Sequence, residues 1–262
     1  MQSGGATCKA MQEAVKQYFE KMEDFYGYEL SFTEKTEGTM LGTILTIYGQ
    51  QQKIKKYFVK VHQGGPKKEA ATSWEKPHLR EVFLYKVLEK IGMISSVHFL
   101  VIPLKQEFLL CIATEEIDMT LLSKRLFGLT DIASNRDNFG LKDGSPVIFD
   151  FSFDTCNLVP IAHKGKDYIL SECTVAEGGP LFRKNWKPDE KKQALREFSK
   201  WKLKQAVEES FTFATEYIKA DNRVSAFRAK YFCQSDAAQI IKDLQDYKNT
   251  ALDNIKFVES LL

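Results

Sequence analysis

The sequence predicts an α+β protein, and three observations favour this class. Residues 30–61 show the two-residue alternation of apolar side chains that is typical of β-strands, with glycines between the runs. A helical stripe of apolar residues precedes them in 8–26, and a second helical segment at 79–91 separates them from two more strand-like runs in 98–112. The expected order is therefore helix, three strands, inserted helix and two strands.

The composition indicates an ordinary globular protein. The chain has 262 residues, 44% of them hydrophobic and 27% charged, which is enough for one large domain or two lobes. The formal net charge of +2 gives no general sign of nucleic-acid binding. Five scattered cysteines without a Cys-x-x-Cys pair favour buried free thiols over disulfides or zinc. No run approaches the roughly 18 apolar residues of a membrane span and no signal-peptide pattern opens the chain, so we expect a cytoplasmic or nuclear protein without a membrane partner.

The third strand contains a lysine in an otherwise apolar run. Strands are expected at 31–37, 42–48, 56–62, 98–104 and 107–112. Lys60 lies in the third, within Tyr57-Phe58-Val59-Lys60-Val61. It is either an edge-strand lysine facing water or a functional cation on the sheet. Taken alone, Glu81, near the start of the helix at 79–91, is one of many solvent-facing helix glutamates.

The second half of the chain is expected to be mainly helical. A short helix at 119–127 leads into a polar loop, and strands at 158–163 and 168–173 follow. One helix is expected from 188 to 220. A last helix, capped by Ser235, carries an apolar stripe to Val258. Such stripes are either core faces or docking faces for a partner.

Residues 129–154 combine a polar loop, a predicted hairpin with an Asp-Gly turn, and a carboxylate after the second strand. This arrangement is able to bring Asn138 and Asp150 near one point, and their oxygen atoms suit Mg²⁺. Asp150 lies between two phenylalanines, where an unpaired carboxylate would be costly to bury. The alternative is a polar hairpin with no ligand.

The order of these elements resembles the protein-kinase-like fold in its divergent forms, such as aminoglycoside and choline phosphotransferases, bacterial toxin kinases and phosphoinositide kinases. The resemblance covers roughly residues 30–155 and rests on order rather than on sequence identity. It implies a two-lobed molecule. Residues 1–117 would form the N-terminal helix and a five-stranded antiparallel N-lobe with one inserted helix, and residues 118–262 a mainly helical C-lobe.

The resemblance assigns nucleotide-binding roles in the N-lobe. Lys60 fits the lysine that binds nucleotide phosphates, and Glu81 fits the glutamate that pairs with that lysine. Residues 113–117 fit the hinge between the lobes, which implies that Glu115 and Ile117 contact the nucleotide. ATP is the implied cofactor.

The resemblance also assigns roles in the Asn/Asp loop. Asn138 and Asp150 fit the two Mg²⁺ ligands. Ala133 stands where the family keeps its catalytic aspartate, so the general base would be Asp131 in a longer loop, or Asp137. The glycines between the first two strands lack the spacing of a phosphate-binding loop, and the connection between hinge and loop is too short for the usual two helices.

Three functions stay open on the sequence. The first is an ATP- and Mg²⁺-dependent phosphotransferase acting on an unknown acceptor. The second is a catalytically inactive, pseudokinase-like module that binds a protein partner through its C-terminal helices. The third is an unrelated α+β interaction domain in which the ordered Lys, Glu, Asn and Asp residues are a coincidence.

Overall fold

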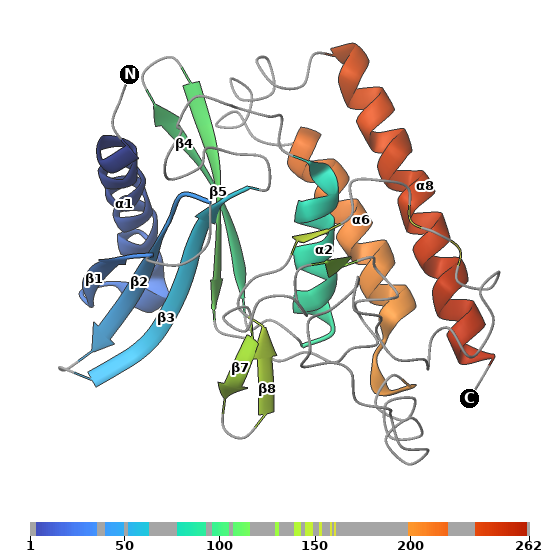
Figure 1. Cartoon of the computed structure of the whole chain (residues 1–262), viewed down its shortest axis with the longest axis horizontal. Coiled ribbons are helices and arrows are strands. Elements are labelled where there is room, and N and C mark those ends of the chain that lie inside the picture. Colours follow the sequence, from blue (N-terminus) through green and yellow to red (C-terminus); the bar gives the residue numbers. More distant parts are fainter. Residues whose placement is uncertain are drawn as a thin grey trace.

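A five-stranded sheet with helices on both faces forms the centre of the molecule (Figure 1). The structure is a computed structural model. It describes residues 4–35, 40–49, 52–62, 78–92, 96–104, 107–115, 129–130, 139–142, 145–148, 152–153, 158, 160, 199–219 and 234–260.

The sheet is antiparallel throughout, with the strand order β1-β2-β3-β5-β4. Its strands are β1 (Glu29–Glu34), β2 (Gly42–Gly49), β3 (Gln52–Val61), β4 (Val97–Leu104) and β5 (Glu107–Glu115). Helix α2 (Leu79–Lys90) lies between β3 and β4 in the chain. The predicted α+β class and the five antiparallel strands with one inserted helix are therefore confirmed.

Helix α1 (Gly4–Glu20) covers one face of the sheet (Figure 1). Met11, Val15 and Phe19 recur every four residues, are fully buried, and belong to one cluster with inward residues of β2 and β3. The expected continuous helix to residue 26 ends early. A short 3-10 turn, η1 (Glu23–Phe25), follows and buries Phe25 against the same cluster.

Gly27 is required by the turn that leads into β1. Tyr26 has φ −61° and ψ 124°, Gly27 has φ 79°, and the Tyr28 N–H donates to the Phe25 carbonyl at 3.1 Å. These values define a type II turn, whose third position favours glycine because it needs a positive φ.

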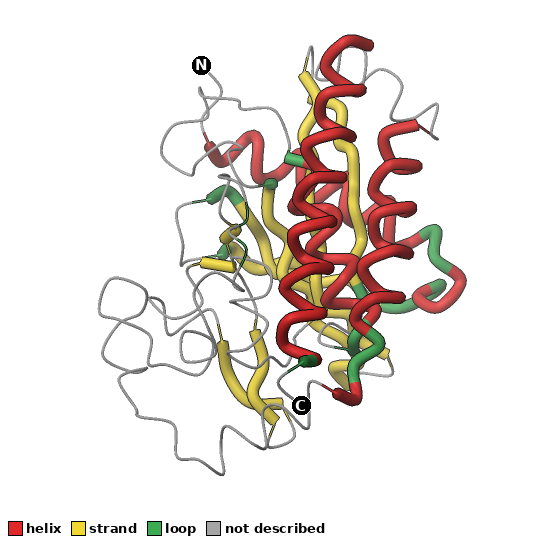
Figure 2. Tube along the Cα trace, turned by 90° about the vertical axis from the view of Figure 1, so that its right-hand side faces the viewer, coloured by secondary structure: helices red, strands yellow, loops and turns green. Residues whose placement is uncertain are grey.

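Helices α2, α6 (Leu203–Lys219) and α8 (Gln234–Glu259) cover the other face of the sheet (Figure 1). Helix α2 is buried on nearly all sides because the sheet packs on one side and α6 on another. Figure 2 shows α6 and α8 side by side. The apolar stripe of α8 packs into this core: Leu244, Tyr247, Ala251, Ile255 and Val258. Its exposed face is polar, so a partner that docks on α8 would contact charged side chains rather than this stripe.

The helix expected from 188 to 220 is interrupted at Trp201 and Lys202, and α6 begins at Leu203. Trp201 and Leu203 both contact the α2 core. Residues two apart point to nearly opposite sides of a continuous helix, so the break allows both side chains to reach the same core.

Two small strand pairs are nested in one segment of the chain. Strand β6 (Leu129–Thr130) pairs with β9 (Ser152–Phe153), and between them β7 (Phe139–Lys142) pairs with β8 (Ser145–Ile148). The predicted hairpin is confirmed in its two strands. Its turn, the expected helix at 119–127, and the strand at 168–173 lie outside the described residues, as does all of the strand at 158–163 except residues 158 and 160.

Candidate functional site

Lys60 lies at the centre of the sheet. Strand β3 is flanked by β2 and β5, with Lys60 opposite Gly42 on one side and Ile112 on the other. Its neighbours Val59 and Val61 pack in the α1 cluster. Because side chains alternate along a strand, Lys60 faces α2. The structure therefore excludes the alternative of an edge-strand lysine.

Glu81 meets Lys60 from the first turn of α2. The N-cap residue is His78, whose ring nitrogen Nδ1 accepts a hydrogen bond from the Arg80 N–H at 3.3 Å. Lys60 Nζ lies 3.7 Å from Glu81 Oε1, and the two side chains are only 11% and 1% exposed. One turn further along, the Tyr85 ring centroid lies 5.5 Å from Lys60 Nζ. The structure thus brings together the predicted lysine and glutamate in a buried ion pair.

The 3.7 Å distance makes this contact an ion pair rather than a hydrogen bond. Burial of two charges is favourable only when each compensates the other, so the position of α2 on the sheet is coupled to the charge of Lys60.

Glu115 lies on the opposite face of the sheet. Its carboxylate Oε2 accepts a hydrogen bond from Lys55 Nζ at 3.2 Å, and its N–H donates to the Ser96 carbonyl at 3.3 Å. Burial lowers the pKa of Lys55, but the hydrogen bond to Glu115 and the charges of Tyr57 and Glu115 outweigh it and leave that pKa raised. The structure does not bring the Glu115 carboxylate to Lys60.

The prediction that residues 113–117 form a hinge is wrong for its first three residues, because Ala113 to Glu115 belong to β5 and pair with β3. Ile117 lies outside the described residues.

The four predicted residues of the Asn/Asp loop, Asp131, Asp137, Asn138 and Asp150, also lie outside the described residues. Within the residues that are described, no group of three His, Cys, Asp or Glu side chains is arranged to hold a metal.

Two groups near the sheet were not predicted from the sequence. The side-chain carbon Cδ of Lys35 lies over Gly42, the partner of Lys60. His98 lies among the rings of Tyr18, Phe19 and Tyr57, and its Nδ1 is 3.2 Å from the Tyr18 hydroxyl. Neither contact could be predicted from the sequence, because each joins two segments whose relative position depends on strand pairing or helix packing.

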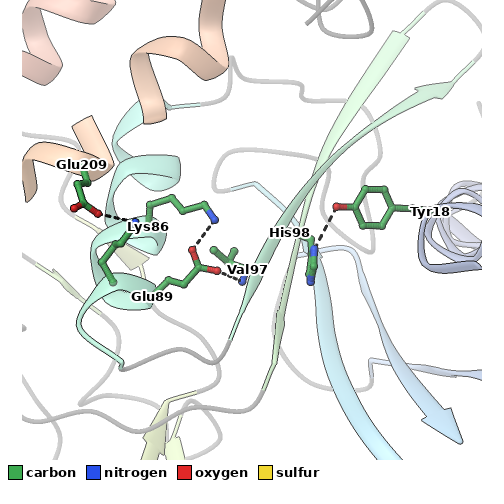
Figure 3. A network of polar contacts seen from close by, with 7 residues as sticks. Tyr18, Lys86, Glu89, Val97, His98 and Glu209 are labelled. Atoms are coloured by element: carbon green, nitrogen blue, oxygen red, sulfur yellow. Dashed lines mark hydrogen bonds and ion pairs between the residues drawn. The ribbon is translucent and has the colours of Figure 1, made fainter. Parts of the chain in front are cut away.

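A chain of polar contacts joins the helices to β4 on the α2 side (Figure 3). Glu89 accepts hydrogen bonds from Lys86 Nζ at 2.6 Å and from the Val97 N–H at 2.9 Å. Lys90 Nζ lies 2.6 Å from Glu209 on α6. Figure 3 shows His98 turned away from this chain toward Tyr18. The Glu89 contact to Val97 joins the end of α2 to the start of β4, and the surface ion pair of Lys90 and Glu209 adds a link between α2 and α6.

Comparison with protein-family models, curated proteins and solved structures found no significant match for this chain. Among the described helices, none combines the length and apolar character needed to cross a bilayer.

Proposed function

We propose that this chain is a divergent kinase-like protein that binds ATP and Mg²⁺ between two lobes and transfers phosphate to an acceptor. The buried ion pair between Lys60 and Glu81 is the observation that carries this proposal. The pair joins the middle strand of the sheet to the first turn of the helix that follows it, as the kinase-like arrangement requires. In this proposal, residues 1–117 form the N-lobe and residues 118–262 form the C-lobe.

The nested strand pairs support the second half of the proposed site. Thr130 pairs with Ser152, so Asp131 directly follows one strand of this pair and Asp150 stands two residues before the other. Phe139 pairs with Ile148, and Asn138 directly precedes Phe139. The proposed base and the two proposed metal ligands therefore belong to one loop that β6 and β9 close.

The donor set fits the proposed ligands. Lys60 supplies a cation for the ATP phosphates, and Glu81 holds it in place. Asn138 and Asp150 would supply oxygen ligands to Mg²⁺, which neutralises phosphate charge when bound. Asp131, or alternatively Asp137, would accept the proton of the acceptor hydroxyl. Ile117 and the backbone near Glu115 would contact the base, although the Glu115 N–H already donates to Ser96.

Thermal unfolding with increasing ATP, with and without Mg²⁺, tests this proposal. A ligand that binds only the folded state raises the melting temperature in a concentration-dependent way. We expect a shift with ATP and Mg²⁺ that disappears in Asp150→Ala. The control variant is Asp253→Ala, an exposed carboxylate on α8, which should keep the full shift. Absence of any shift with nucleotide and metal would contradict the proposal.

A second candidate function is a pseudokinase-like module that keeps the fold and binds a protein partner. Ala133, at the position of the missing catalytic aspartate, favours it. Incubation with ATP labelled at the γ-phosphate separates the two candidates. Release or transfer of label that is lost in Asp131→Asn and kept in Asp253→Ala supports the enzyme. A thermal shift without any turnover supports the module.

A further inference from the structure

Strand β4 is an edge of the five-stranded sheet, with β5 on its inner side. The Glu115 N–H of β5 donates to the carbonyl of Ser96, which directly precedes β4, at 3.3 Å. Along an antiparallel strand, alternate residues bond the same neighbour, so the even-numbered residues of β4 bond β5. The N–H and C=O groups of the odd-numbered residues, including Phe99 and Val101, therefore point out of the sheet.

The two ends of this outer edge lack an available donor. The Val97 N–H donates to the Glu89 carboxylate of α2 at 2.9 Å, and Pro103 has no N–H. Among the residues that the structure describes, none bonds the outward backbone groups of Phe99 and Val101. The centre of the edge therefore offers two donors and two acceptors to another strand.

Strand β4 also lacks the charges that oppose pairing at an exposed edge. The other edge strand of the sheet, β1, has Glu29 and Glu34 at its two ends, and both are exposed. By contrast, Val97–Leu104 contains no Lys, Arg, Asp or Glu, and only Pro103 near its end blocks a bond. Charged side chains are a common means of preventing edge-to-edge association. Of the two edges, β4 is the one suited to pairing.

Exposed aromatic side chains lie beside β4 on both faces of the sheet. On the α1 face, Tyr18 is 37% exposed and its ring centroid lies 5.7 Å from that of His98. On the α2 face, Phe213 is 37% exposed and its ring centroid lies 6.1 Å from that of Phe99. Aromatic side chains are enriched in the interfaces between proteins. A strand added to β4 would thus meet apolar surface on both faces.

We infer that two copies of this chain associate through β4, which pairs antiparallel with itself about a twofold axis at Leu100 and joins the two sheets. In this register Phe99 of each copy lies opposite Val101 of the other, and their outward groups form four hydrogen bonds. The adjacent registers pair one of these residues with Val97 or Pro103 and leave a carbonyl without a donor. In the symmetric register Val97 and Pro103, which lack available donors, face each other instead. The inference does not depend on nucleotide binding.

Sedimentation velocity of the full chain over a range of concentrations, with amide hydrogen exchange followed by NMR, tests the inference. We expect a species of twice the monomer mass that increases with concentration. Exchange at Phe99 and Val101 should slow at least about ten-fold once about nine-tenths of the chain is dimeric, because only the remaining monomer exchanges. The His98 and Leu100 amides, which already bond β5, are the internal control and should change less than about three-fold.

Two outcomes of this experiment would overturn the inference. A chain that stays monomeric at all concentrations has no such dimer, and its β4 edge would be left for an extended segment of another protein. A dimer in which exchange at Phe99 and Val101 does not change is formed through a different surface.

Substitution of Val101 provides an independent test. Val101→Lys places a cation on the edge opposite Phe99 of the other copy, and should raise the Kd of the dimer at least about ten-fold. The matched control is Val101→Thr, which keeps the N–H, the β-branched shape and the neutral charge, and should change Kd less than about three-fold. Thermal melting checks that both variants are folded. Equal dimer affinities in the two variants would overturn the inference.

Discussion

The two faces of the sheet carry two different lysine–glutamate pairs from the same strand. On the α2 face, Lys60 and Glu81 are 3.7 Å apart, and their side chains are 11% and 1% exposed. On the α1 face, Lys55 and Glu115 are 3.2 Å apart, with the lysine 35% exposed. The more deeply buried pair thus has the longer contact. The Lys55 pair joins neighbouring strands, whereas the Lys60 pair joins the sheet to a helix.

The two pairs differ in whether water can reach the remaining charge when one partner is lost. When Lys55 loses its partner, its ammonium can still reach solvent, so the loss is small. Lys60 lies under α2, where an uncompensated charge is costly. Replacement of a buried ion pair by apolar residues is often neutral or stabilising, so stability alone does not explain this long contact. It is well suited to holding a cation for another anion, which is the role proposed here.

Loss of one partner of the buried pair should have the largest effect. Lys60→Met leaves the Glu81 carboxylate buried without its cation, so we expect the free energy of unfolding to fall by about 3–5 kcal/mol. The double variant Lys60→Met/Glu81→Met should recover most of this loss, since an apolar pair of similar volume replaces the ions. Urea unfolding measures both. A double variant no more stable than Lys60→Met would mean that the two residues are not coupled.

Acid should weaken the α1 face through His98. Burial, the dominant cause, and the nearby cations Lys86 and Lys55 lower the pKa of His98 from 6.5 to about 4, although Glu89 and Glu115 act in the opposite direction. The unfolded chain therefore binds this proton first as the pH falls. The contribution of neutral His98 is complete above pH 6.5 and is lost between pH 6.5 and about 4.

The expected loss is about 2–3 kcal/mol over that range. It is measured as the difference in pH dependence between the wild type and His98→Phe, which keeps an aromatic ring beside Tyr18 but cannot titrate. Carboxylates titrate in both proteins and cancel in this difference. Equal pH dependence in the two proteins would show that His98 is not held neutral.

Loss of the pair on the α1 face should cost little. Lys55→Met removes the contact to Glu115, but the lysine is partly exposed and its partner lies at the end of a strand, so we expect a loss of at most about 1 kcal/mol. Urea unfolding beside Lys60→Met gives the comparison directly. A loss as large as that of Lys60→Met would remove the distinction between the two faces.

A surface pair on the helices should contribute least. Glu209 lies at the surface with its side chain 39% exposed, and its hydrogen bonds from Lys90 and Gln205 lower its pKa. Glu209→Gln keeps the shape and removes the charge, and we expect no measurable change in the urea midpoint at physiological salt. A clear decrease would indicate that the contact between α2 and α6 depends on this charge.

Local patterns predicted the order of elements but not their lateral arrangement. The two-residue period predicted the strands and the helical period predicted α1 and α2, and the resemblance to the kinase-like fold singled out Lys60 and Glu81 as a pair. The pattern does not contain strand order or register. It therefore left open whether Lys60 was on an edge strand, placed Ala113 to Glu115 in the hinge rather than in β5, and missed Lys35. The break at Trp201 arises from tertiary packing, which the helical pattern does not report.

The most direct test of the central claim is the affinity of folded Lys60→Met and Lys55→Met for ATP with Mg²⁺, measured by calorimetry beside the wild type. If Lys60 holds nucleotide phosphates, Lys60→Met should lose at least about ten-fold in affinity while Lys55→Met, altered on the same strand but the other face, stays close to the wild type. Equal affinities in all three proteins, or no ATP binding by the wild type, would contradict the claim.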